Sequence, residues 1–177
     1  MLYAQWLIQM ESKLRFIVKK IRMKNMKSPK HSETIMTEIV CPNDTNPMGI
    51  LQGGKLVQWM DIASAICAQN HAEHICVTAS IDSVKFKSPA KVGDIITIKA
   101  KMTRSFHSSM EIFVQAWAKK ILSQKAYLIN EAYFTFVALD DNANPTIVPA
   151  IKATSETEKK EFANALKRKN HRIKNKN

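Results

Sequence analysis

The residues best suited to chemistry lie in the run GILQGGKLVQWMD, residues 49–61, where a loop meets an apolar segment. Gly53 and Gly54 let the backbone approach a ligand closely, because glycine carries no Cβ. They open a predicted helix, whose first N–H groups lack partners and attract negative charge. Asp61 lies seven residues past Gly54, about 10 Å further along that helix. Donors at the start of a helix and an acid two turns later make this run the first candidate for a site, and they raise the question of what an acid does within an apolar helix.

Two interpretations of Asp61 are open from the sequence. Its helical neighbours, among them Val57, Met60 and Ile62, are apolar, and an unpaired carboxylate is costly to bury. Function is a good reason to keep such a group. The alternative is that its side of the helix is simply exposed.

Hydrophobic periodicity predicts the elements that carry these residues. A helix is expected from about residue 54 to 72, because the segment has no Pro and is apolar on every side, which indicates a buried helix. Alternation predicts strands over 33–40, 75–90, 95–106, 110–122 and 126–140. The segment 154–177 predicts a polar, peripheral helix that begins with a capping box of Ser155 and Glu158.

The order of these elements predicts the fold class. Short turns join the last four strands, so we expect them to pair antiparallel. One apolar helix must be covered by that sheet, which makes the class α+β, with the sheet wrapped around a long central helix. The free edges of the sheet favour pairing with a second copy.

The net charge of +12 belongs to the two ends of the chain. Residues 1–30 hold eight Lys or Arg and one Glu, residues 151–177 hold nine and three, and residues 31–150 carry ten basic and eleven acidic groups. We therefore expect three parts with these bounds: a basic extension, a nearly neutral folded domain, and a C-terminal helix with a basic tail. A nucleic-acid partner is not expected of the folded domain.

The extension, 1–30, is expected to be dispensable, although its apolar and basic residues also fit a surface-seeking amphipathic helix. No stretch of about 18 uncharged apolar residues exists, so stable membrane insertion is not expected. Three cysteines without metal or redox spacing indicate reduced thiols in a cytoplasmic protein. Scattered histidines argue against a metal site, and the absence of a G-x-S-x-G elbow argues against a serine esterase.

The order of elements, together with several motifs, resembles the hotdog fold. The run PNDTNPMGILQGGKLVQWMD (42–61) looks like the loop-and-helix signature of the acyl-CoA thioesterase subgroup of hotdog proteins, which includes the YciA-type enzymes and brain acyl-CoA hydrolase. Further matches are VTASIDSVKF (77–86), VGDIITIKA (92–100), SSMEIFVQAW (108–117) and AYFTFVALD (132–140). The resemblance covers residues 33–166.

The resemblance implies an activity and an assembly. The chain would hydrolyse acyl-CoA to a free acid and coenzyme A, which is then part of the substrate, and no cofactor or metal is expected. Asp61 of one chain would face the Gly54 region of a second, where backbone N–H groups stabilise the oxyanion of the thioester. Asp61 would then act either as a general base on water or as a nucleophile. The family also implies a homodimer at least, and a hexamer built as a trimer of dimers.

The remaining site candidates are weaker. Asn46 is a second catalytic candidate, although Asn also favours turns. Ile50 and Gln52 differ from the residues that relatives often carry, which leaves open a non-catalytic protein that binds acyl-CoA or a nucleotide. Binding of acyl-CoA is assigned to Gly53, Gln52, Thr78, Ser80, Lys85, Arg104, Ser108, Ser109 and Lys119. For these lysines and hydroxyls the alternative is a solvated face of the sheet. A third possibility is that the basic tails bind nucleic acid or an acidic membrane.

Overall fold

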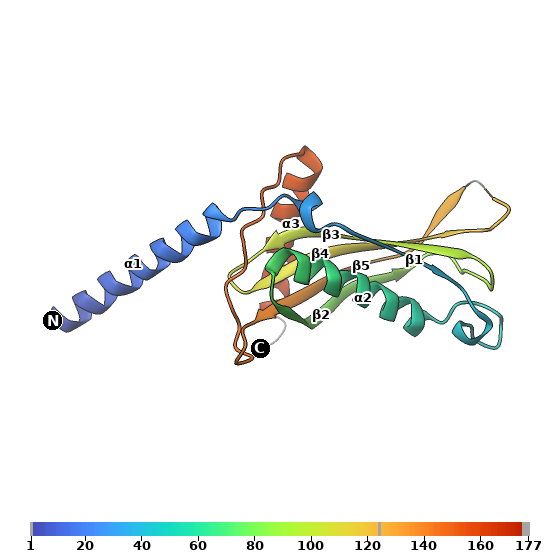
Figure 1. Cartoon of the computed structure of the whole chain (residues 1–177), viewed down its shortest axis with the longest axis horizontal. Coiled ribbons are helices and arrows are strands. Elements are labelled where there is room, and N and C mark those ends of the chain that lie inside the picture. The colour runs from blue at the N-terminus through green and yellow to red at the C-terminus, as the bar shows by residue number, and fades with distance from the viewer. Residues whose placement is uncertain (1, 124, 175–177) are drawn as a thin grey trace.

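The computed structural model describes residues 2–123 and 125–174, and it places a long helix across a five-stranded antiparallel sheet (Figure 1). The strand order is β1-β3-β4-β5-β2, which confirms the predicted class. The elements are α1 Leu2–Lys24, β1 Thr34–Ile39, α2 Gly53–Ala72, β2 Ile75–Phe86, β3 Ile95–Ser105, β4 Ser109–Lys119, β5 Ala126–Leu139 and α3 Glu156–Lys174, with short 3-10 helices at Pro29–Ser32 and Pro42–Asp44.

The core lies between α2 and one face of the sheet. Alternate residues of β3, from Ile96 to Met102, are buried, and β4 and β5 follow the same period. Trp59 and Met60 of α2 are buried against this face. The alternation read from the sequence is thus the alternation between the two faces of the sheet. β2 ends at Phe86 rather than at residue 90, since the following Ser-Pro pair cannot continue the ladder.

One face of α2 contradicts the prediction of a helix buried on all sides. Ile62 and Ile66 expose 43% and 40% of their surface, and Gln58 is exposed as well. These positions recur every four residues, so they form a single outward stripe. The edge strand β2, which contacts α2, also exposes Ile75 and Val77. The apolar side chains on this side of α2 and β2 are therefore not buried in the core of the single chain but form an exposed surface.

α3 crosses the opposite face of the sheet from α2 (Figure 1). Its predicted capping box is confirmed: Glu158 N donates to Ser155 Oγ at 3.2 Å, and Ser155 N donates to Glu158 Oε2 at 3.2 Å. The helix is not merely peripheral, because Arg168 donates twice to Glu111 of β4, at 3.0 and 2.7 Å. Glu111 is fully buried, so α3 supplies the cation that makes its burial tolerable.

α1 extends from the body as an arm whose C-terminal end is attached (Figure 1). Arg22 Nε donates to the Val148 carbonyl at 3.0 Å, and the Lys27 amide donates to the Ala150 carbonyl at 3.0 Å. The segment predicted as a basic extension is therefore a helix joined to the region near residue 150. The proposed bounds of the three parts remain a prediction.

The three cysteines are free thiols, as predicted. Burial raises the pKa of Cys67 to about 12 and that of Cys76 to about 11. None of the helices described in 2–123 and 125–174 is both long and apolar enough to cross a membrane.

Candidate active site

The start of α2 is shaped by its two glycines. The first intrahelical hydrogen bond runs from Leu56 N to the Gln52 carbonyl at 3.0 Å, so the three preceding N–H groups point out of the helix end. A Cβ at Gly54 would meet nothing within 4 Å, whereas one at Gly53 would lie 3.0 Å from the Phe86 ring. Gly54 thus leaves open space beside the donors, and Gly53 lets the aromatic ring pack against the helix start.

In the loop before α2, the side-chain amides of Asn46 and Gln52 both form hydrogen bonds to the backbone of the loop. Asn46 Oδ1 accepts hydrogen bonds from Met48 N at 3.0 Å and Ile50 N at 3.2 Å. Gln52 Nε2 donates to the Thr45 carbonyl at 2.9 Å. These bonds fix the chain that leads into the helix. In the part of the chain that the structure describes, the Asn46 amide nitrogen donates to no protein acceptor, so it keeps hydrogen-bonding capacity for a ligand.

Asp61 lies on the outward stripe of α2, half-buried rather than in the core. Thr78 of β2 donates its hydroxyl proton to Asp61 Oδ1 at 2.8 Å. The second oxygen, Oδ2, accepts no hydrogen bond from the described residues. Thr78 comes just before a β-bulge, where the register with β5 shifts between Thr78 and Ser80. The carboxylate is therefore held by a neighbouring element while one oxygen faces outward.

A hollow of about 330 Å³ adjoins the start of α2. It lies within the size range of small-molecule sites. Gly53 and Leu56 form its helical side, and Phe86 and Ile129 form the side from the sheet. The lining is mainly apolar, so this hollow suits an acyl or pantetheine chain better than a phosphate.

Two of the predicted coenzyme-binding hydroxyls lie together near α3. Ser80 and Ser109 line a hollow of about 200 Å³ with Lys169 and Arg172. Ser80 donates to Asp82 Oδ2 at 3.3 Å, and Arg172 donates to the same oxygen at 2.6 Å. Neither cation was predicted as a site residue, because the charge run that contains them was interpreted as part of a peripheral helix with a basic tail. The i, i+3 spacing of the two is the signal that places them on one side of a helix.

The other predicted coenzyme ligands are not gathered around this hollow. Ser109 and Lys119 stand at opposite ends of β4, about 34 Å apart at the rise of a strand. Lys85 lies opposite Glu131 on β2 and β5. The Ser108 carbonyl accepts a hydrogen bond from the Ala138 amide at 2.9 Å and so pairs with β5. A single chain therefore cannot bring all of these residues to one ligand.

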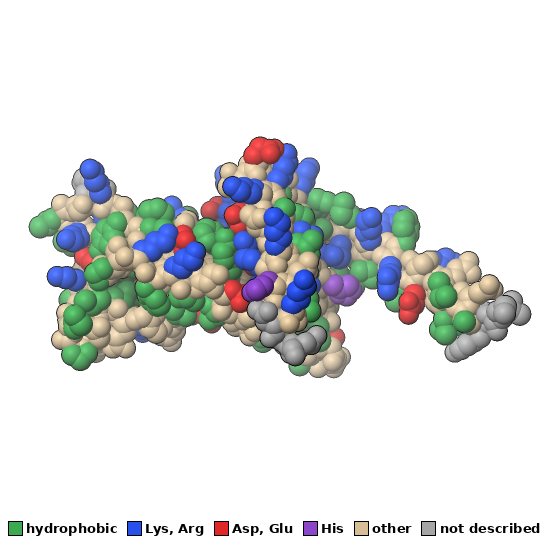
Figure 2. All heavy atoms as spheres, turned by 180° about the vertical axis from the view of Figure 1, so that it is seen from behind, with side chains coloured by type: hydrophobic (Ala, Val, Ile, Leu, Met, Phe, Trp, Pro, Cys, Tyr) green, Lys and Arg blue, Asp and Glu red, His purple; other side chains and the backbone are tan. Residues whose placement is uncertain are grey.

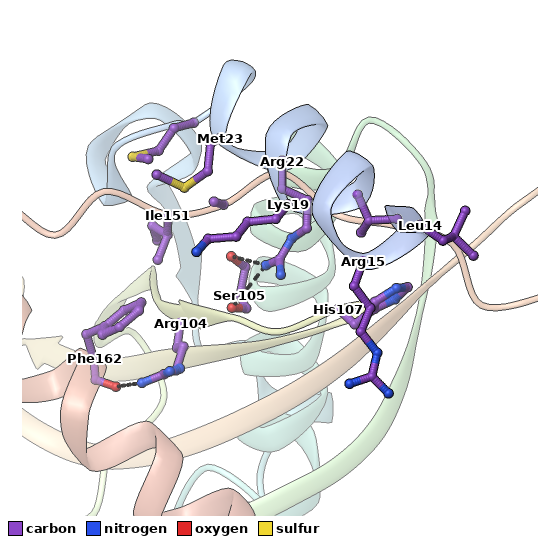
Figure 3. A pocket seen from close by; sticks show the side chains of 13 residues that line it. Leu14, Arg15, Lys19, Arg22, Met23, Arg104, Ser105, His107, Ile151 and Phe162 are labelled. Carbon is purple, nitrogen blue, oxygen red and sulfur yellow. Dashed lines mark hydrogen bonds between the residues drawn. The ribbon is translucent and has the colours of Figure 1, made fainter. Parts of the chain in front are cut away.

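Arg104 is engaged on the face away from α2. Its Nη1 donates to the Phe162 carbonyl at 2.8 Å, and its guanidinium lies 4.0 Å from the Phe162 ring centroid. Burial lowers the pKa of Arg104. The residue lines a cavity of about 640 Å³ between α1, β3 and α3, together with Arg22, His107 and Ile151 (Figure 3). It thus lies apart from the start of α2.

Metal ligands are not clustered among residues 2–123 and 125–174. No group of three His, Cys, Asp or Glu side chains there is arranged to hold a metal ion.

An antiparallel sheet of five strands wrapped around one long helix is the arrangement of the hotdog fold. The profile of the Thioesterase superfamily matches residues 48–123. The acyl-CoA thioester hydrolase YkhA of Bacillus subtilis, described as uncharacterized, is 36% identical over 81% of this chain and 83% of its own length. The chain belongs to the thioesterase superfamily.

Solved structures and mammalian relatives agree with this assignment. An apo-hexameric acyl-CoA thioesterase superposes with a TM-score of 0.82 at 37% identity, over 85% of this chain and 97% of its own. The Staphylococcus aureus acyl-CoA hydrolase, solved with butyryl coenzyme A and coenzyme A, superposes with a TM-score of 0.78 at 38% identity. This match covers 85% of this chain and 94% of the hydrolase. Mouse acyl-coenzyme A thioesterase 11 is 36% identical over 80% of this chain. The chain spans only 24% of that relative and 43% of the rat cytosolic acyl coenzyme A thioester hydrolase.

Proposed function

We propose that this protein is an acyl-CoA thioesterase that hydrolyses acyl-CoA to a carboxylic acid and coenzyme A. The observation that carries the proposal is the Asp61 carboxylate, held at 2.8 Å by Thr78 on the uncovered face of α2. A carboxylate fixed by one oxygen presents its other oxygen to water or to the thioester carbon. The N–H groups near Gly54 are the donors for the oxyanion.

The solved relatives support the choice of residues. The Staphylococcus aureus hydrolase has separate alanine variants of an asparagine, of an aspartate 15 residues later, and of a threonine 17 residues after the aspartate. Asn46, Asp61 and Thr78 have the same two spacings. We assign Asp61 as base or nucleophile, Thr78 as the residue that orients it, and the Asn46 amide nitrogen as a donor to the substrate or water.

The proposed site is shared by two copies of the chain. Asp61 lies about 10 Å along α2 from Gly54, too far for both to reach one carbonyl of a compact thioester within the chain. The outward stripe of α2, with Ile62 and Ile66, lies beside the edge strand β2. Pairing of two copies over this surface would cover these apolar groups and set Asp61 of one against Gly54 of the other. The hexameric relatives support three such dimers.

The rest of the proposal concerns the ligand and its location. The apolar hollow beside Gly53 would take the acyl or pantetheine chain, and the cations Lys169 and Arg172 would lie near phosphates of coenzyme A. The reaction uses water and needs no metal or redox cofactor. We place the protein in the cytoplasm, as its mammalian relatives named cytosolic suggest.

The test is coenzyme A release from a panel of short to long acyl-CoAs by the full chain and two variants. Asp61→Asn keeps the shape of the side chain but removes the base. Asp141→Asn makes the same change at an exposed position in the turn after β5 and is the matched control. We expect turnover to fall about 100-fold or more in the first variant, the usual loss of a general base, and to stay unchanged in the second.

Other outcomes would redirect the assignment. If the unmodified chain binds coenzyme A but releases none from any acyl-CoA, the non-catalytic binding protein takes the place of the enzyme. If the chain is active and Asp61→Asn retains full turnover, the thioesterase function stands and Asp61 is not its base or nucleophile.

A further inference from the structure

The protruding helix α1 has the composition of a helix that lies on a membrane surface. It carries six Lys or Arg and one Glu, and it exposes large apolar side chains along its length. Figure 2 shows blue and green side chains mixed on the arm that projects from the body. A basic amphipathic helix of this kind is stable at the boundary between lipid headgroups and acyl chains.

The two sides of α1 have different surroundings. Arg15, Lys19 and Arg22 project toward the body and line the cavity below the helix (Figure 3). Arg22 is fixed there by its hydrogen bonds to the Val148 and Ser105 carbonyls. The attached end of α1 therefore sets which side of the whole helix faces away from the protein.

The side that faces away carries an apolar stripe of Met10 and Ile17. These two residues are seven positions apart and expose 50% and 49% of their surface, whereas Ile21, one turn further on, lines a hollow against the body with His74 and Pro149. At about 3.6 residues per turn, the apolar stripe lies roughly opposite to Arg15 and Lys19. In the single chain, the apolar stripe is therefore exposed to water.

A lysine follows each residue of the apolar stripe at a distance of three positions, and a third lysine lies one turn further along the helix. Lys13, Lys20 and Lys24 form this lysine flank, which lies along one border of the apolar stripe. Within the part of the chain that the structure describes, no carboxylate forms an ion pair with these lysines. A lysine beside an apolar surface can bury its stem and keep its ammonium group at the level of lipid phosphates.

We propose that α1 binds the surface of membranes that contain anionic lipids, through the apolar stripe and the lysine flank. The apolar stripe enters the headgroup boundary and the lysine flank pairs with lipid phosphates, while the rest of the domain stays in water. The charges of the helix and the membrane are complementary, since the helix has a net positive charge and the membrane surface is negative. The proposal goes beyond the thioesterase function and does not depend on it.

The experiment is cosedimentation of the full chain with vesicles of phosphatidylcholine alone, or mixed with phosphatidylglycerol, at about 0.15 M salt. Ile17→Glu places a negative charge in the apolar stripe. Ser12→Glu adds the same charge outside the apolar stripe, on the side of α1 that carries Arg15 and Lys19, and is the matched control. We expect binding to the anionic vesicles only, about tenfold weaker binding for Ile17→Glu than for Ser12→Glu, and weaker binding at higher salt.

Any of three results would overturn the proposal, the first two from sedimentation and the other from the mass of the assembly. The first is that the unmodified chain does not sediment with anionic vesicles, and the second is that both variants lose binding equally. The third is that Ile17→Glu changes the mass of the assembly measured by light scattering, since the apolar stripe would then be a contact between copies. Circular dichroism of each variant shows whether the helical content is kept.

Discussion

The hydrogen bond from Thr78 to Asp61 gives a quantitative test of the proposed site. Valine has the shape of threonine with a methyl group in place of the hydroxyl, so Thr78→Val removes the 2.8 Å bond and little else. A hydrogen bond to a charged group contributes about 1.5–3 kcal/mol. If the bond orients the carboxylate in the transition state, kcat/KM should fall by about 10–150-fold.

The assay is steady-state coenzyme A release by the variant at several acyl-CoA concentrations. Thr78→Ser keeps the hydroxyl and should recover most of the activity, which separates the hydrogen bond from the packing of the side chain. Urea unfolding of both variants checks that the fold is intact. The Thr78 hydroxyl does not orient the Asp61 carboxylate if Thr78→Val retains the activity of the unmodified protein, or if Thr78→Ser is as impaired as Thr78→Val.

Three further predictions concern the fold around the site. Gly53→Ala should lower the free energy of unfolding by about 1 kcal/mol relative to Gly54→Ala, because only its Cβ would press on an aromatic ring 3.0 Å away; equal urea midpoints would contradict this. Arg168→Met should lower the free energy of unfolding by about 3 kcal/mol, since it removes two hydrogen bonds and leaves the buried Glu111 carboxylate only a 3.7 Å ion pair with Arg172, and a loss near zero would show that the Arg168 pair does not anchor α3. Hydrogen bonds from the Thr154 amide and from Lys101 hold the pKa of Glu158 at about 2, below its usual 4.5. The unfolded chain therefore binds a proton first, so stability from this group is complete above about pH 4.5 and is lost as the pH falls toward 2; Glu158→Gln should flatten this part of the acid unfolding curve.

Much of the fold could be predicted from local sequence. The period-two segments became β1 to β5, and the segment free of Pro from residue 54 onward became α2, because side chains that alternate or recur every three to four positions decide which face is buried. Ser155 and Glu158 form their capping box within one helical turn. The residues that form such features lie close together in the sequence, so their interactions can be predicted from local spacing.

The choice of residues 49–61 as the candidate site also came from the sequence alone. Two glycines before a helix and a carboxylate seven residues later are unusual in an apolar segment, and they were enough to single out Gly54 and Asp61. The sequence left the surroundings of Asp61 open between a buried acid and an exposed side of the helix. The structure places it half-buried on the outward stripe of α2.

Only the tertiary structure decided which distant side chains meet. Thr78 reaches Asp61 from another element, and Arg168 reaches Glu111 across 57 positions of sequence. The spacing of residues along one helix or strand cannot encode such contacts, since they depend on how the elements pack against each other. The sequence by itself determined the elements and the residues capable of chemistry. The packing of α2 and α3 on opposite faces of one sheet decided which of them are held in place and which remain free to act.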